Sequence, residues 1–227
     1  MDNAKVNKYD LNKYSAVLAK EWTFCDELNS MARQASAERA WSAISRFYDN
    51  CKNKNPGKKR FPQFQKDNRS VEYKTSGWRL AVDRKSIIFT DKKGVGKLQL
   101  KGTHDLHFSQ PTQIKRVRLV KRADGYYVQL CIQVDRSEKI EVTGNAIGLD
   151  VGLKEFYTDS NGVAVENPRF LRKGERRLKK AHRRVSKRVK DSQNRRKARV
   201  ILGKRHLKIS RQRKDFAVKL ALRRYPV

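Results

Sequence analysis

The sequence predicts an α+β protein, and three observations support this prediction. Residues 9–52 place apolar side chains three and four positions apart, which is the spacing of amphipathic helices. From residue 70 to residue 135 the pattern changes to a period of two, which is typical of β-strands. After residue 145, short apolar runs precede a long basic segment with helical spacing. We therefore expect N-terminal helices, a small antiparallel β-barrel, the start of a second sheet and a basic antiparallel helical hairpin.

The N-terminal helices are predicted from one buried apolar stripe that includes Leu11, Trp22 and Trp41. Ser36 precedes a second run of helical spacing and is the candidate N-cap of the second helix. The basic connector at residues 52–60 contains Pro and Gly and cannot continue a helix. This region is therefore expected to be helical up to about residue 52.

Six short strands are predicted next, separated by turn-forming residues. They are expected at residues 71–75, 78–82, 86–89, 97–101, 114–121 and 126–135. Antiparallel strands at this spacing are typical of a small barrel or curled sheet, similar to OB-folds. Trp78, Tyr126 and Tyr127 are candidates for stacking on bases, although we expect most of them to lie in the core. Cys131 is expected to be a small core residue.

A second β unit is predicted at residues 146–151, 155–158 and 163–166, with a hairpin turn at Asn161 and Gly162. Asn167 and Pro168 are typical of an N-cap followed by the first residue of a helix. The seam of this helix is expected to contain Leu171, Leu178, His182, Val185 and Val189. After a polar break at residues 190–194, a second seam is expected to contain Leu202, His206, Ile209, Arg213, Phe216 and Leu220.

Two helices joined by so short a break make an antiparallel hairpin with a narrow apolar seam. His182 and His206 fall on the two seams and are expected to face each other or the sheet. In contrast, His104 and His107 have no third donor near them in the sequence, so a metal site there is not expected.

Positive charge is concentrated in this hairpin. Residues 168–224 contain 25 Lys and Arg and three acids, so they carry +22 of the net charge of +32. A solvated helix face usually interleaves acids with bases, whereas acids are nearly absent here. Such a segment attracts polyanions and releases their counterions on contact. The candidate phosphate contacts on its polar faces are Arg172, Arg176, Lys179, Arg183, Arg188, Arg195, Arg196 and Arg199.

Asp150 is the candidate catalytic and metal-binding residue. It lies in a short apolar run between Gly148 and Gly152, and a carboxylate removed from water needs compensation such as a metal ion. The plainer interpretation is an Asp that caps a turn at the end of a strand. An actin-type phosphate loop also begins with Asp-x-Gly, but it usually continues with Thr or Ser where this chain has Leu153.

Several ordered blocks of the chain resemble the TnpB family, the OrfB-type proteins of bacterial insertion sequences. The blocks are Phe61-Pro-Gln-Phe64, Gly125-Tyr-Tyr-Val128, Ile147-Gly-Leu-Asp-Val-Gly-Leu-Lys154, Glu166-Asn-Pro-Arg-Phe-Leu-Arg-Lys173 and Asn194-Arg-Arg-Lys-Ala-Arg199. The resemblance extends from about residue 29 to residue 224. It implies a recognition region at residues 1–59, a wedge-like barrel at 60–140 and part of a ribonuclease-H-like (RuvC) nuclease domain at 141–227.

The resemblance also implies an activity, because the family consists of RNA-guided DNA endonucleases that use Mg²⁺. Asp150 corresponds to the first of three catalytic acids, and the expected partners are a guide RNA and target or transposon DNA. The family's other two acids and its zinc ribbon have no counterpart in this sequence. We therefore expect these 227 residues alone to bind nucleic acid without cleaving DNA, as a truncated copy or with a separately encoded C-terminal half.

Two other functions remain open at this point: a non-catalytic protein that binds guide RNA or DNA, and a general nucleic-acid packager without sequence preference. Cys25, Cys51 and Cys131 form no Cys-x-x-Cys pair, so neither a zinc ribbon nor a disulfide framework is expected. No run of 18 apolar residues is present, so no membrane span is expected. The expected location is the bacterial cytosol or nucleoid.

Overall fold

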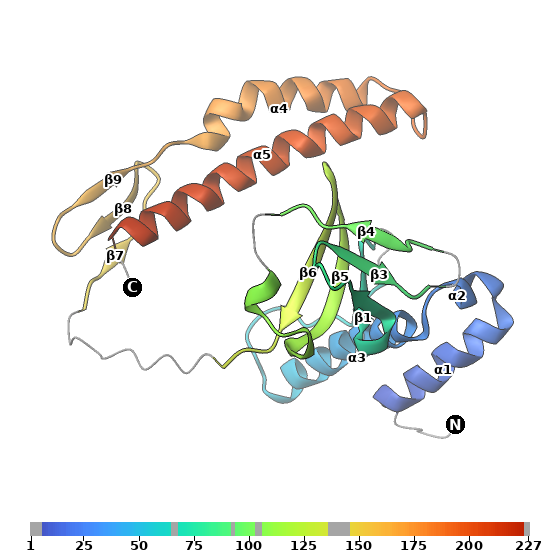
Figure 1. Cartoon of the computed structure of the whole chain (residues 1–227). Coiled ribbons are helices and arrows are strands. Elements are labelled where there is room, and N and C mark those ends of the chain that lie inside the picture. Colours follow the sequence, from blue (N-terminus) through green and yellow to red (C-terminus); the bar gives the residue numbers. More distant parts are fainter. Residues whose placement is uncertain (1–5, 65–67, 92–93, 103–105, 136–145, 225–227) are drawn as a thin grey trace. The chain divides into compact units, whose positions relative to one another are not determined.

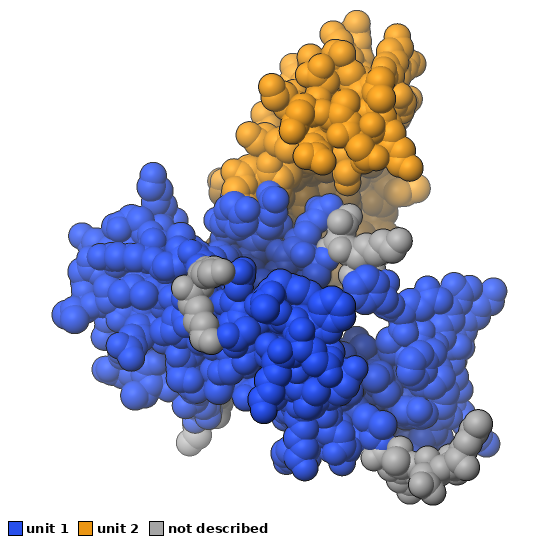
Figure 2. Space-filling view, turned by 90° about the vertical axis from the view of Figure 1, so that its right-hand side faces the viewer, with its two compact units in different colours: residues 1–122, 126–136 blue, residues 123–125, 137–227 orange. Residues whose placement is uncertain are grey.

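The fold confirms the α+β class and separates into two compact units (Figures 1 and 2). The computed structural model describes residues 6–64, 68–91, 94–102, 106–135 and 146–224. Unit 1 contains residues 1–122 and 126–136, and unit 2 contains residues 123–125 and 137–227. His104 lies outside the described residues, so the proposed pairing with His107 is not described. Over the described residues, no helix is both long and apolar enough to cross a membrane.

Unit 1 begins with three helices: α1 (Lys8–Glu21), α2 (Thr23–Glu27) and α3 (Ser30–Lys52). Asn7 and Asp10 form a capping box at the start of α1, and the Asn29 side chain accepts a hydrogen bond from the Met31 amide at the start of α3. The predicted cap at Ser36 is wrong, because its hydroxyl lies inside α3 and donates to the carbonyl of Ala32 at 3.1 Å. The local Ser-x-Glu pattern does not reveal that the helix has already begun one and a half turns earlier.

The predicted single apolar stripe along these helices is also wrong. Ala32 and Ala35 are the buried residues of α3, and none of the described residues of α1 or α2 is buried. Trp22 is 55% exposed, because the chain turns there between α1 and α2. The small side chains of α3 allow its backbone to lie close to β1, against which it packs.

Over its described residues, unit 1 continues with six strands and three short 3-10 helices. The strands are β1 (Ser70–Lys74), β2 (Trp78–Leu80), β3 (Ser86–Phe89), β4 (Lys97–Gln99), β5 (Ile114–Arg122) and β6 (Gly125–Ile132). The 3-10 helices are η1 (Thr75–Gly77), η2 (Leu106–Phe108) and η3 (Pro111–Gln113). The strands form two three-stranded sheets, ordered β1-β5-β6 and β2-β3-β4, rather than one closed barrel over the described residues.

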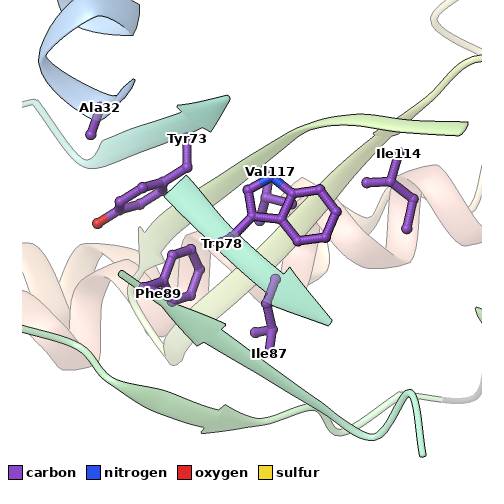
Figure 3. Close-up of a cluster of buried hydrophobic side chains, with 7 residues drawn as sticks. All are labelled: Ala32, Tyr73, Trp78, Ile87, Phe89, Ile114 and Val117. Atoms are coloured by element: carbon purple, nitrogen blue, oxygen red, sulfur yellow. The ribbon is translucent and has the colours of Figure 1, made fainter. Parts of the chain in front are cut away.

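The core of unit 1 lies between these two sheets and α3 (Figure 3). Tyr73 of β1 and Phe89 of β3 pack their rings with centroids 4.6 Å apart, and Ile87 and Val117 are fully buried beside them. Trp78 is 8% exposed and belongs to this core. Side chains from both sheets therefore share one apolar cluster, which fixes the sheets against each other.

A network of ion pairs ties α3 to the first sheet. Glu72 of β1 is 6% exposed and accepts hydrogen bonds from Arg116 at 2.8 Å and from Arg118 at 2.5 and 3.0 Å. Glu38 of α3 pairs with Lys74 and with Arg116 at 3.5 Å. The paired strands β1 and β5 place Glu72, Lys74 and Arg116 on one face of the sheet. Arg116 pairs there with both acids, with Glu72 of its own sheet and with Glu38 of α3.

Unit 2 consists of a small sheet and a long helical hairpin. The sheet has strands β7 (Leu149–Asp150), β8 (Glu155–Asp159) and β9 (Ala164–Glu166), all antiparallel and in that order. The helices are α4 (Phe170–Ser186) and α5 (Gln193–Arg224). The predicted turn at Asn161 and Gly162 is confirmed: Gly162 has φ +79°, and buried Asp159 accepts bonds from the amides of Asn161 and Val163.

Candidate nucleic-acid interface

Helices α4 and α5 pack along each other as the predicted antiparallel hairpin (Figure 1). Their contact is narrow, since Leu178 and Ala181 of α4 and Ala198 of α5 are its buried residues. Gly174 permits the close approach: a Cβ at this position would lie 2.7 Å from Cδ1 of Ile209. Such a contact is too short for two carbon atoms, so a larger residue at 174 would require the end of the Ile209 side chain to move.

His182 and His206 face each other across this hairpin, as predicted. Their Nε2 atoms are 3.4 Å apart and their rings meet edge to face, with centroids 5.5 Å apart. The two ring nitrogens are within hydrogen-bonding distance, and the tautomers of the rings decide which one donates. The pair therefore fixes the register of α4 against α5 at the level of these two residues.

The hairpin seam is narrower than predicted. Leu171 and Val189 are 54% and 77% exposed, so neither lies in the seam. His182, His206 and Arg213 are also exposed, although the histidine rings touch. Three residues, Leu178, Ala181 and Ala198, are buried among the described residues of the hairpin, and long basic side chains occupy much of the remaining helix surface.

The eight candidate phosphate contacts all lie on this hairpin. Seven are exposed, whereas Arg195 is half-buried at the start of α5 and donates to the carbonyl of Arg188 at 3.2 Å. Lys179 forms an ion pair with Glu175 at 2.8 Å. This pair is exposed on both sides and is weak in water, so Lys179 can exchange Glu175 for a phosphate at little cost.

Asp150 lies at the end of β7, where it pairs with Thr158 of β8. It is exposed, as are its strand neighbours Leu149 and Val151 at 49% and 77%. The carboxylate is therefore not removed from water within unit 2, and burial gives no reason to expect a metal ion here. The apolar residues of this strand have no covering layer among the described residues of unit 2, so apolar composition alone does not indicate burial here.

A groove of about 1030 Å³ begins directly after Asp150. The segment Val151–Leu153 forms one wall, and Phe156, Phe170 and Phe216 form an apolar floor. The ring of Phe216 meets those of Phe156 and Phe170 edge to face, with centroids 5.1 and 6.0 Å away. The cations that line the groove are Arg169, Arg172, Arg213 and Lys214.

The groove brings the strand of Asp150 next to one predicted phosphate contact, Arg172. The other seven predicted contacts are absent from its lining and lie further along the hairpin. Arg169, Arg213 and Lys214 were not predicted as contacts, and Arg213 was assigned to the apolar seam instead. The helical spacing places Arg213 in that seam, whereas in the structure Arg213 is exposed and Phe216, three residues later, packs against Phe156 and Phe170.

Asn167 connects the start of α4 to the wall of the groove. Its side-chain amide donates to the carbonyl of Leu153 at 3.3 Å, and its side-chain oxygen accepts from the amide of Arg169 at 3.0 Å. The prediction that Asn167 and Pro168 begin the helix is wrong by two residues: α4 begins at Phe170. Arg169 precedes it in a left-handed conformation with φ +47°, which is costly for a non-glycine residue and often marks a functional site.

The candidate ligand for a magnesium ion beside the groove is Asp150. Carboxylate oxygen is the donor that Mg²⁺ prefers, and the exposed Asp150, which directly precedes the lining residue Val151 in the chain, offers one such group. Over the described part of the chain, no group of three or more His, Cys, Asp or Glu residues is arranged to hold a metal ion. No other protein ligand to such an ion can be named from this arrangement.

The candidate stacking residues of unit 1 have different environments. Trp78 is in the core, whereas Tyr126 is 66% exposed and Tyr127 is 36% exposed. Lys121 lies 5.9 Å from the centre of the Tyr126 ring, and this cation–π contact leaves much of the ring accessible. The expectation that most of these three residues lie in the core is wrong: Trp78 does, whereas Tyr126 and Tyr127 are both exposed. The expectation of a core position is also wrong for Cys131, which is exposed on β6.

Comparison with known proteins yields one family and two relatives. The model of the OrfB_IS605 family, described as "Probable transposase", matches residues 129–223. A Streptomyces pristinaespiralis protein named "Putative RNA-guided DNA endonuclease" is 30% identical over 207 residues, which cover 90% of this chain and 48% of that protein. The Escherichia coli K12 protein "Putative RNA-guided DNA endonuclease InsQ" is 24% identical over 107 residues, or 47% of this chain and 27% of that protein. The chain thus spans at most about half the length of these relatives.

Proposed function

Because the chain belongs to the OrfB-type (TnpB) transposase family, we propose that its 227 residues form a nucleic-acid-binding part of a transposon-encoded, RNA-guided DNA endonuclease. The observation that carries this proposal is the α4–α5 hairpin, with 25 Lys and Arg in residues 168–224 and seven of its eight candidate contacts exposed. Guide RNA and target or transposon DNA are the proposed ligands, and both would be held through their phosphates. The proposed location is the bacterial cytosol, where both ligands occur.

Asp150 is the proposed catalytic residue, as the first carboxylate of a Mg²⁺ site. Nucleases that use two metal ions stabilise both the attacking and the leaving oxygen of the phosphodiester, and several carboxylates hold the ions. Asp150 would supply one ligand at the edge of the groove. Arg172, which lines the same groove, would hold the adjacent phosphate, and the exposed segment after Asp150 would allow the nucleic-acid strand to approach.

A single carboxylate holds divalent ions weakly, so we expect the 227-residue chain to bind RNA and DNA without guide-directed cleavage. The assay incubates the protein with Mg²⁺, the RNA that co-purifies with it and DNA of the matching sequence. The expected result is a stable complex with no product above background.

The matched variants for this assay are Asp150→Asn and Asp191→Asn, which each remove one exposed carboxylate from unit 2. Neither should change the affinity for DNA by more than about twofold, since each changes one charge among many. Specific cleavage by the wild type that Asp150→Asn abolishes and Asp191→Asn preserves would show that these residues suffice for catalysis, against our expectation.

A second candidate function is a non-catalytic protein that holds guide RNA or transposon-end DNA. The exposure of Asp150, with no acidic cluster around it in the described residues, favours this alternative. Both functions predict that one defined RNA species co-purifies with the protein. A general packager would instead retain a mixture of RNAs, which sequencing of the bound RNA would detect.

A further inference from the structure

The loop that follows α3 encloses a second pocket, in unit 1 and separate from the groove of unit 2. Its volume is about 280 Å³. Phe47 and Asn50, on the last turns of α3, form one side, and the loop forms the other. The loop residues that line it are Asn55, Pro56, Gly57, Lys58, Lys59 and Arg60.

The loop is held against the helix by two hydrogen bonds between asparagines. The backbone amide of Asn55 donates to the carbonyl of Asn50 at 3.2 Å, and the side-chain amide of Asn55 donates to the side-chain oxygen of Asn50 at 2.8 Å. Lys54 and Gly57 have φ of +49° and +104°, which reverse the direction of the chain on either side of Asn55. Each asparagine side chain has further hydrogen-bonding capacity that this contact does not use.

An aromatic ring forms the apolar wall of the pocket. Phe47 is half-buried, and its ring meets those of Tyr48 and Phe61 edge to face, with centroids 5.4 Å away in each case. These edge contacts fix the orientation of the Phe47 ring. A fixed ring beside an accessible pocket is a platform for stacking a planar group.

The rim of the pocket is strongly cationic. Lys58, Lys59 and Arg60 are all exposed, and none of the lining residues is acidic. An anion at this rim meets three positive charges, which the loop places in consecutive positions. An aromatic wall, two amides and a cationic rim together match the base, the base edge and the phosphate of a nucleotide.

We propose that this pocket binds one unpaired nucleotide of RNA or single-stranded DNA. The base stacks on Phe47, the amides of Asn50 and Asn55 bond to its edge, and Lys58–Arg60 hold the flanking phosphates. A volume of about 280 Å³ lies at the low end of ligand pockets, so it admits one base but not a base pair. This inference rests on the proposed function and adds a site for single strands to the electrostatic binding by the hairpin.

The test uses the 227-residue protein with three probes of one sequence: single-stranded RNA, single-stranded DNA and duplex DNA. The variant Phe47→Leu keeps an apolar side chain and removes the stacking surface. We expect it to weaken binding of the preferred single strand about tenfold and to leave duplex binding unchanged. Phe108→Leu is the matched control, because Phe108 is 86% exposed in the same unit and absent from the pocket.

A second measurement does not depend on the variants. Single strands that carry photoreactive 4-thiouridine or 4-thiothymidine should crosslink to the peptides that contain Phe47 or residues 55–61. Stronger crosslinking of the RNA identifies a guide-type ligand, and stronger crosslinking of the DNA identifies a displaced strand. Asn55→Ala should reduce the crosslink while the midpoint of thermal unfolding stays within a few degrees of the wild type.

The proposal that this pocket binds a nucleotide is contradicted if no crosslink maps to these peptides. It is also contradicted if Phe47→Leu lowers the affinities for duplex and single strands equally. The proposed function survives either outcome if substitution of the eight candidate contacts on the hairpin still lowers the affinity for duplex DNA about a thousandfold. If the wild type binds none of the three probes, the proposed function fails as well. The two failures are thus distinguished by the duplex probe and by the variants of the other unit.

Discussion

Substitution of the eight candidate phosphate contacts by Gln should lower the affinity for duplex DNA about a thousandfold at 0.1 M salt. Each neutralised phosphate releases condensed counterions, and this release is the main driving force of binding by a cationic surface. The other Lys and Arg residues of the hairpin preserve part of the field, so binding is weakened but not eliminated. Fluorescence anisotropy with a labelled duplex of about 20 base pairs measures the change.

A control variant distinguishes the contribution of the hairpin cations to the affinity from that of positive charge elsewhere on the protein. Exposed cations of unit 1 are suitable for substitution by Gln, namely Lys13, Lys20, Arg46, Lys97, Lys101 and Lys115. Their loss should weaken binding less than tenfold, because they do not lie on the hairpin. Arg195 donates a hydrogen bond to the carbonyl of Arg188, so its loss could also affect the folding of the hairpin. A variant with the other seven substitutions, which keeps Arg195, shows whether the loss of affinity persists without this effect. Equal losses of affinity for duplex DNA in the hairpin and control variants would contradict an interface localised on the hairpin.

Replacement of Glu72 by Ala should lower the free energy of unfolding of unit 1 by about 2 kcal/mol. The substitution removes three charge-assisted hydrogen bonds from Arg116 and Arg118. The loss of a partner in a buried ion pair costs more, about 3–5 kcal/mol, but both arginines are nearly half exposed and are rehydrated in the variant. The midpoint of thermal unfolding should fall by about 8 °C.

This contribution depends on pH in a defined direction. Burial raises the pKa of the Glu72 carboxyl, but the hydrogen bonds and charges of Arg116 and Arg118 outweigh burial, so its pKa lies below the usual value of 4.5. A lowered pKa in the folded state means that the stabilisation is present above pH 4.5 and is lost as the pH falls through the folded-state pKa. The wild type and Glu72→Ala should therefore differ at pH 7 and converge in acid.

Urea unfolding of both proteins between pH 3 and pH 7 measures this convergence. Glu21→Gln serves as the control, because Glu21 is exposed at the end of α1. A constant difference across the whole pH range would show that the packing of the Glu72 side chain, and not its charge, stabilises the sheet.

The sequence predicts the elements of this protein well where a pattern is regular. The spacing of four and three residues in the basic segment places His182 and His206 on facing sides of two helices, and the structure confirms their contact. The Asn161-Gly162 dipeptide likewise predicts a turn because few other residues adopt φ above zero. These signals are local, and no distant contact competes with them.

The sequence fails where a distant contact decides the outcome. Asn167 and Pro168 satisfy the local rule for the start of a helix, but Asn167 instead bonds to the carbonyl of Leu153, and α4 begins at Phe170. Gly174 shows no pattern of its own, yet it lies against the side chain of Ile209, whose end would have to move if residue 174 carried a Cβ.

The candidate site shows the same division. The charge of the hairpin and the position of Asp150 on a strand are evident from the sequence, whereas the groove that joins them is not. It depends on Phe216, which lies 46 positions beyond Phe170 in the chain and packs against both Phe170 and Phe156. This contact brings Arg213 and Lys214 to the groove. Periodicity describes one helix at a time and cannot locate such a meeting point.

The most direct test of the electrostatic interface is the salt dependence of binding by the wild type. If the hairpin neutralises eight phosphates, a plot of log affinity against log salt concentration for duplex DNA has a slope of about −7, and a shallower slope for single strands. The eightfold Gln variant should reduce the slope toward zero. A wild-type slope near zero, or a slope of about −7 that the variant preserves, would contradict the assignment of α4–α5 as the surface that binds nucleic acid.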